Sequence, residues 1–91
     1  MIFAILGFDS PEGAEKRPQY RPEHLARLEA LEKEGKLLLA GPFTDGAGSL
    51  ILIQADSLAE AEAFAKGDPY VRHGVFNRLE VHPFKQVFPQ S

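Results

Sequence analysis

Two short segments of the chain contain a histidine and an aspartate that could act together in acid–base chemistry. The segment 21–25 (RPEHL) contains His24, and the segment 67–70 (GDPY) contains Asp68. A neutral imidazole can accept a proton, and a carboxylate bound to its other nitrogen holds one tautomer and stabilises the protonated ring. We therefore predict a catalytic pair in which His24 is a general base and Asp68 orients it.

His24 is expected to point into the protein from the first turn of a helix. Pro22 suits the first helical position and Gly35 stops the helix, while residues 9–21 are predicted to form a loop. At about 100° per residue, His24 falls on the apolar side of this helix, with Leu28. In a first turn, unpaired backbone N–H groups and the helix dipole favour the neutral imidazole.

Apolar runs and turn signals divide the rest of the chain into four strands and a second helix. The strands are predicted at 2–8, 37–40, 49–55 and 75–81, and the second helix at 57–66. This order predicts an α+β, ferredoxin-like βαββαβ fold, a four-stranded antiparallel sheet with both helices on one face. The two most apolar strands, 2–8 and 49–55, are expected at the centre of the sheet, with strand 75–81 at an edge.

The second helix and the last strand have patterns that predict which side chains are buried. Ser57 and Glu60 have capping-box spacing at the start of the helix. The helix residues expected to face inward are Leu58, Ala61, Phe64 and Ala65. In the last strand, alternation places Val75, Asn77, Leu79 and Val81 on one side, and Phe76, Arg78 and Glu80 on the other, more charged side.

Size and composition restrict the classes of function. The 91 residues fit one domain over 1–91, and a sheet face that neither helix covers predicts a second subunit, in a homodimer or a larger homo-oligomer. Ten basic against 13 acidic residues, with a net charge of −3 and no basic run, argue against nucleic acid as a partner. Because the chain has no Cys, no export signal and no apolar run of roughly 20 residues, a cytoplasmic protein without a membrane span is expected.

The other polar residues leave alternatives open. Neither a metal nor a cofactor site is predicted, because the three His lack the spacing of metal ligands and the glycines form no phosphate loop. Arg21 can bind a carboxylate or phenolate of a substrate, or pair with Glu23. Tyr70 can line a pocket or only pack in the core. His24 can equally be satisfied by a backbone carbonyl, and Asp68 can cap a short helical turn.

The chain resembles the YciI-like proteins of the YCII-related domain family in short motifs spread over nearly its whole length. These are Arg21-Pro22-x-His24-Leu25, Ala40-Gly41-Pro42, Ser49, Asp68-Pro69-Tyr70, Gly74-Val75 and Pro83-Phe84-Lys85. The resemblance implies a fold of the dimeric α+β barrel group, to which muconolactone isomerase also belongs. It also implies that His24 and Asp68 are the catalytic pair, with Ser49 close by. Related domains have Asp where this chain has Ala40, so any role of that aspartate does not transfer.

One enzyme of this family removes chloride from a chlorinated hydroxyhydroquinone. Together with the residues, this leads to the hypothesis of a cofactor-independent lyase, such as a dehydrochlorinase, or an isomerase that abstracts a proton from a small cyclic or aromatic metabolite. Ser49 and Arg21 would then hold substrate oxygens. The alternatives are a ligand-binding or regulatory module without turnover, and a structural dimer in which the His–Asp pair ties two helices together. An imidazole and carboxylate about 2.6 to 3.2 Å apart beside an open pocket would argue against the structural role.

Overall fold

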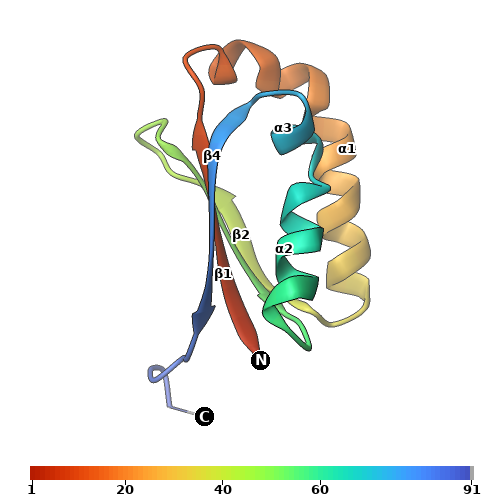
Figure 1. Ribbon diagram of the computed structural model, residues 1–91, viewed down its shortest axis with the longest axis vertical. Coiled ribbons are helices and arrows are strands. Elements are labelled where there is room, and N and C mark those ends of the chain that lie inside the picture. Colours follow the sequence, from red (N-terminus) through yellow and green to blue (C-terminus); the bar gives the residue numbers. More distant parts are fainter. Residues whose placement is uncertain (91) are drawn as a thin grey trace.

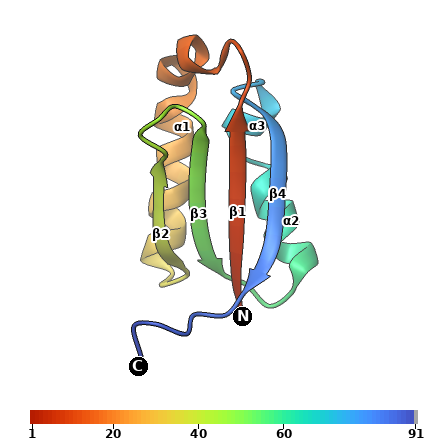
Figure 2. The ribbon, with the colours of Figure 1, turned by 90° about the vertical axis from the view of Figure 1, so that its left-hand side faces the viewer.

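The apolar segments of the chain form one antiparallel sheet in the computed structural model, which describes residues 1–90. The strands are β1 (Ile2–Asp9), β2 (Leu37–Pro42), β3 (Gly48–Gln54) and β4 (Phe76–Phe84), in the order β2-β3-β1-β4 (Figure 2). Ile5 of β1 lies opposite Ile51 of β3 and Val81 of β4. The predicted central pair and the predicted edge strand are therefore confirmed.

Three helices pack on one face of this sheet (Figure 1). They are α1 (Gly13–Lys33), α2 (Leu58–Lys66) and the short α3 (Pro69–Arg72). Ser57 has an extended backbone before α2, and its hydroxyl accepts a hydrogen bond from the Glu60 N–H at 3.1 Å, as the capping spacing predicts. The arrangement is the predicted α+β, ferredoxin-like one.

The start of α1 differs from the prediction. A loop over residues 9–21 and a helix start at Pro22 were both wrong, because α1 begins at Gly13 and contains Pro18 and Pro22. Each proline removes one backbone N–H from the hydrogen-bond ladder of the helix. Contacts with distant segments support this first half, including a Lys16 Nζ bond to the His73 carbonyl at 3.3 Å. His24 therefore lies in the middle of α1, so the argument from unpaired N–H groups and the helix dipole does not apply to it.

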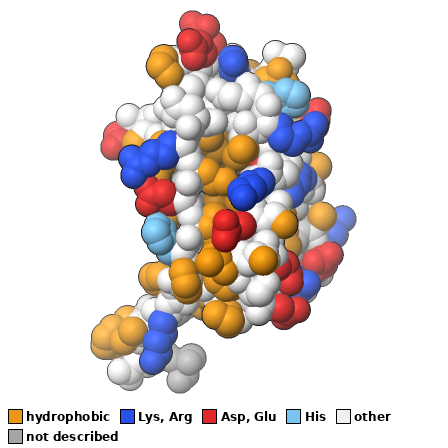
Figure 3. Space-filling model, in the orientation of Figure 1, with side chains coloured by type: hydrophobic (Ala, Val, Ile, Leu, Met, Phe, Trp, Pro, Cys, Tyr) orange, Lys and Arg blue, Asp and Glu red, His pale blue; other side chains and the backbone are white. Residues whose placement is uncertain are grey.

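The core lies between the sheet and the helices. Its larger cluster comprises Phe3, Ile5, Leu28, Ile51, Ile53, Ala55, Ala61 and Ala65, and its smaller cluster comprises Tyr70, Val75 and Phe76. Figure 3 shows hydrophobic side chains between β4 and the helices, along this edge of the molecule. Leu58, predicted to face inward, is instead 41% exposed, because it is the first residue of α2 and lies outside these clusters.

A change of register in β4 reverses the predicted position of Phe76. Phe8 lies opposite Arg78, but its neighbour Asp9 lies opposite Phe76, so the strand has one extra residue at Asn77. Phe76 therefore turns to the helix side and is 5% exposed, where alternation had placed it on the more charged side. Its ring lies over Gly7, where a Cβ would be 2.3 Å from it.

Among residues 1–90, no helix covers the opposite face of the sheet (Figure 2). Strand alternation places the half-buried Ile2, Ala4, Leu6, Phe8, Leu50 and Leu52 on this face. Beside them on β4, Glu80 accepts hydrogen bonds from Arg78 and His82. We call this surface the outer sheet face. Within residues 1–90, no helix combines the length and the apolar character that crossing a membrane requires.

Candidate functional site

The structure brings His24 and Asp68 together although 44 positions separate them in the chain. His24 Nδ1 is 2.8 Å from both carboxylate oxygens of Asp68, and the two residues are 6% and 4% exposed. Because an ionised carboxylate can only accept hydrogen bonds, the donor in this contact is Nδ1–H of the imidazole. Nε2 of His24 has no hydrogen-bond partner among the described residues and retains contact with solvent. A neutral ring would therefore offer Nε2 as a free acceptor.

Asp68 is held in place by the start of α3. Its Oδ1 accepts a hydrogen bond from the Tyr70 N–H at 2.8 Å, and Pro69 occupies the first helical position, where an N–H is not needed. Asp68 therefore both caps α3 and pairs with His24, since one carboxylate has enough acceptor sites for both hydrogen bonds.

Tyr70 fixes the plane of the imidazole. The rings of Tyr70 and His24 stack with their centroids 3.9 Å apart and an interplanar angle of 7°. The edge of Phe76 supports Tyr70 from another side, with 5.4 Å between centroids and an angle of 90°. Because Tyr70 is only 1% exposed, the imidazole is restrained by a contact that is itself rigidly packed.

A pocket of about 230 Å³ opens between α1 and the β2–β3 hairpin beside this pair. Its lining comprises Arg17, Arg21, His24, Leu25, Leu28, Ala40, Gly41, Pro42, Ser49, Ile51 and Tyr70. The predicted site residues Arg21, Ser49 and Tyr70 are therefore all brought to one cavity with His24. Asp68 does not line it, because it lies behind the imidazole.

Arg17 is a pocket residue that the sequence analysis missed. Its Nε and Nη2 donate to the two carboxylate oxygens of Asp9 at 2.9 and 2.7 Å, and Nη2 also donates to the Ser49 hydroxyl at 3.3 Å. The hydrogen bonds to Asp9 raise the pKa of Arg17 above its ordinary value, against the opposing effect of burial. Because α1 begins at Gly13, Arg17, Arg21 and His24 lie on one face of the helix. Their spacing would have indicated Arg17 as a pocket residue if the earlier helix start had been predicted.

Arg27 lies on the same helix, beyond the His–Asp pair. Its Nη2 donates to the Phe64 carbonyl at 2.9 Å, and its guanidinium lies 4.4 Å from the centre of the Phe64 ring. Burial lowers the pKa of Arg27, and the charge of Asp68 partly opposes this effect. Arg27 therefore ties α1 to the end of α2, the segment that leads to Asp68.

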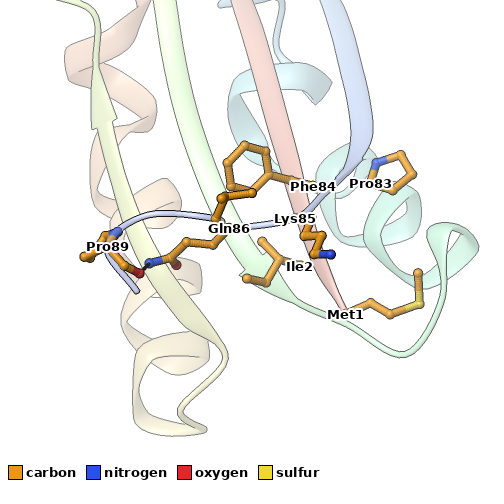
Figure 4. Close-up of a pocket in the computed structure, with 8 residues that line it drawn as sticks. Met1, Ile2, Pro83, Phe84, Lys85, Gln86 and Pro89 are labelled. Carbon is orange, nitrogen blue, oxygen red and sulfur yellow. Dashed lines mark hydrogen bonds between the residues drawn. The ribbon is translucent and has the colours of Figure 1, made fainter. Parts of the chain in front are cut away.

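A larger hollow of about 630 Å³ lies at the other end of β1, under the C-terminal segment (Figure 4). Met1, Ile2 and residues 83–87 and 89 line it, and it shares no lining residue with the His24 pocket. Among the described residues that line it, Lys85 has the only ionisable side chain, so these residues supply no acid–base pair. Within residues 1–90, no group of three His, Cys, Asp or Glu side chains is placed to hold a metal ion.

Known proteins resemble this chain in sequence and in structure. The sequence pattern of the YCII-related domain family matches residues 1–85. A YciI protein of Escherichia coli O6:H1 is 43% identical over 98 residues, which cover 97% of this chain and 100% of that protein. An uncharacterised protein of Haemophilus influenzae is 40% identical over 101 residues, with the same coverage. The structure of 5-chloro-2-hydroxyhydroquinone dehydrochlorinase from Burkholderia phenoliruptrix AC1100, in complex with 2,5-dihydroxybenzoquinone, is 30% identical with a TM-score of 0.82, covering 93% of this chain and 94% of that one.

Proposed function

This chain belongs to the YCII-related domain family, and from that premise we propose that it is a cofactor-independent lyase or isomerase whose general base is His24. The observation that carries the proposal is the 2.8 Å contact between His24 Nδ1 and the Asp68 carboxylate beside an open pocket. A sealed pair would favour a purely structural role, whereas this imidazole lines a cavity. The substrate class is a small, polar, cyclic or aromatic metabolite.

The proposed chemistry uses the two nitrogens of His24 differently. Nδ1–H donates to Asp68, and Nε2 takes a proton from the substrate, so that the imidazolium formed is stabilised by the adjacent carboxylate. The electron pair left on the substrate either forms a double bond while a leaving group departs, or remains until the proton returns at another atom. The first outcome is an elimination and the second an isomerisation.

The size and lining of the pocket support a single-ring substrate. A volume of about 230 Å³ accommodates one ring with small substituents, and drug-sized ligands occupy larger cavities. Leu25, Leu28 and Ile51 supply apolar walls, while Ser49 and Arg21 can hold substrate oxygens. The dehydrochlorinase with the similar fold is named for a chlorinated, hydroxylated ring, which is a substrate of this class.

We also propose that the protein is a homodimer in which the outer sheet face packs against its copy. The apolar side chains of β1 and β3 on that face have no helix over them. Burying such a face against a second copy removes apolar area from water and enlarges a core that is small at this chain length. The pocket lies on the helix side of the sheet, so dimerisation leaves its lining intact.

The test of the catalytic proposal is turnover by the wild-type protein and by His24→Ala. Purified protein is assayed with 5-chloro-2-hydroxyhydroquinone for chloride release, and with other hydroxylated aromatics and lactones for loss of substrate. We expect wild-type turnover and a loss of about 10²- to 10⁴-fold in His24→Ala. His82→Ala is the matched control, because His82 lies on the edge strand β4, is 60% exposed and does not line the pocket.

The outcomes separate the proposed classes of function. Equal turnover by wild type and His24→Ala would overturn the assignment of the base. Binding of a ring compound in the pocket without any product would identify a ligand-binding or regulatory module instead. The circular dichroism spectrum and the melting temperature of each variant establish that the fold is retained.

A further inference from the structure

Arg17 has donors that the folded chain does not use. Nε–H and Nη2 donate to Asp9 and Ser49, which accounts for three of its five N–H groups. Nη1 makes no hydrogen bond of normal geometry within residues 1–90 and is not buried away from solvent, and the side chain of Tyr70 contributes less than Asp9 to the raised pKa of Arg17. Because Arg17 lines the pocket, its two remaining N–H groups are available to a ligand there.

Asp9 fixes the orientation of this guanidinium. The two parallel hydrogen bonds, at 2.9 and 2.7 Å, form the bidentate geometry that holds an arginine plane against a carboxylate. The guanidinium also lies 5.2 Å from the centre of the Tyr70 ring, the ring that stacks on His24. Arg17 is thus held in position before any ligand arrives, which reduces the entropy that binding must remove.

The Arg17–Asp9 pair repeats the plan of the His24–Asp68 pair. In each pair, the residue on α1 lines the pocket and its carboxylate partner lies behind it, outside the lining. The two α1 positions are seven residues apart, which is about two helical turns or 10 Å along the axis. In the described part of the chain, the lining of this pocket contains two arginines and no acidic side chain.

Ser49 adds a donor beside Arg17. Its hydroxyl oxygen accepts the hydrogen bond from Arg17 Nη2, so its O–H is directed elsewhere, and Ser49 lines the pocket while only 4% exposed. An anionic oxygen placed here would therefore meet N–H and O–H donors and no repelling carboxylate.

We propose that Arg17 is the specificity-determining residue of the pocket and binds an oxyanion, a carboxylate, enolate or phenolate, carried by a planar ring. This inference rests on the proposed function, because it places the anion at one end of the pocket and the base at the other. Removal of a proton by His24 adds negative charge to such a ring. Arg17 and Ser49 stabilise that charge where it develops, since preorganised donors act most strongly in a water-poor site.

The test compares two ligands of one shape and different charge. Benzoate and benzamide are titrated at pH 7 into wild type, Arg17→Met, Asp9→Asn/Arg17→Met and Arg72→Met, and binding is followed by NMR at the Ser49 and Tyr70 amides. The double variant removes Arg17 together with its partner charge, so that no carboxylate is left unpaired and the net charge is unchanged. Arg72→Met is the matched control for removing one positive charge, because Arg72 is exposed on α3 and does not line the pocket.

We expect wild type to bind benzoate at least tenfold more tightly than benzamide, the ratio that one charge-assisted hydrogen bond provides. The ratio is expected to fall below about threefold in both Arg17 variants and to stay near the wild-type value in Arg72→Met. A wild-type ratio in the double variant, or equal binding of both ligands by wild type, would overturn the role of Arg17 while leaving the ring pocket intact. If neither ligand binds wild type, both this inference and the proposed pocket are wrong.

Discussion

The ring of Phe76 occupies the space in which a side chain on Gly7 would lie, since an added Cβ would be 2.3 Å from it. Phe76 contacts Tyr70, and Tyr70 stacks on His24, so two ring contacts connect Gly7 with the proposed base. Gly7→Ala is expected to displace Phe76 and to lower the free energy of unfolding by about 1–3 kcal/mol, as overpacked cores do. Urea denaturation measures this loss, and turnover should fall as the imidazole loses its support.

Gly41→Ala is the matched control for that experiment. Gly41 also lies in a strand, but nothing stands within 4 Å of a Cβ added to it. This variant should unfold like the wild type. If Gly7→Ala were as stable as Gly41→Ala, the contact between Phe76 and Gly7 would not restrain the site.

Asp68→Asn separates the two roles of this side chain. The amide oxygen can still accept from the Tyr70 N–H, but the amide nitrogen then faces His24 Nδ1 and donates to it. This moves the ring proton to Nε2, so we expect a loss of at least about 10²-fold in kcat/KM with little change in melting temperature. Nitrogen NMR of the imidazole reports the tautomer directly.

Asp68→Ala provides the comparison, because it removes the cap as well as the orienting acid. Loss of a cap typically costs about 0.5–2 kcal/mol of stability, so this variant should be the less stable of the two. An Asp68→Asn protein with wild-type activity would show that the carboxylate acts only as a helix cap.

Leu52→Glu tests the proposed homodimer. Leu52 is half-buried on the outer sheet face, and a charge there would have to be desolvated in an interface between two copies. We expect the wild type to sediment as a dimer at micromolar concentration and Leu52→Glu to shift towards the monomer. Leu58→Glu, at an exposed position on the helix side, should leave the assembly unchanged. A monomeric wild type would contradict the proposal.

Glu80 gives the outer sheet face a defined response to pH. The hydrogen bond from His82 and the charge of Arg78 hold the pKa of Glu80 below its ordinary value. A carboxyl group with a lowered folded-state pKa stabilises the fold above its unfolded-state pKa, and this contribution disappears as the pH falls through the folded-state pKa. In Glu80→Gln, the decline of melting temperature with acidification below pH 4.5 should therefore be shallower than in the wild type.

The effect is expected to be small, because the three side chains lie on the edge strand β4, beside the apolar β1 and β3 surface proposed to pack against a second copy, and are screened by water at the surface of the single chain. Glu62→Gln removes an exposed acid that pairs with Lys66 at 3.9 Å on α2, and it serves as the comparison. Melting curves of wild type and Glu80→Gln that stay parallel down to the acid transition would show that the Arg78–Glu80–His82 contacts add no stability.

Local signals predicted much of the fold and the centre of the site. The cap at Ser57 and the inward direction of His24 depend on spacing within a few residues, and the strand order follows from the order of the elements, so one sequence is enough to predict them. Asp68 before Pro69 indicated a cap for the same reason.

The errors occurred where distant residues decide the local structure. Pro22 is well suited to a helix start, yet the contacts of Arg17 with Asp9 and of Lys16 with His73 support an earlier one. The periodicity of hydrophobic residues along the sequence does not reveal these long-range contacts, so Arg17 was missed. The position of Phe76 depends on an extra residue in β4, which simple alternation cannot anticipate.

The pocket divides its tasks between two parts of the chain. The long helix α1 carries the polar side chains of Arg17 and His24, whereas Ala40 and Pro42 of the β2 edge strand form part of the opposite wall. Neither Ala40 nor Pro42 takes part in the hydrogen bonds that orient Arg17 and His24. Enlarging Ala40 would therefore narrow the cavity while Arg17 and His24 keep their geometry. On the proposed function, a change at this wall alone would alter the size of ring that fits without disturbing the proposed base.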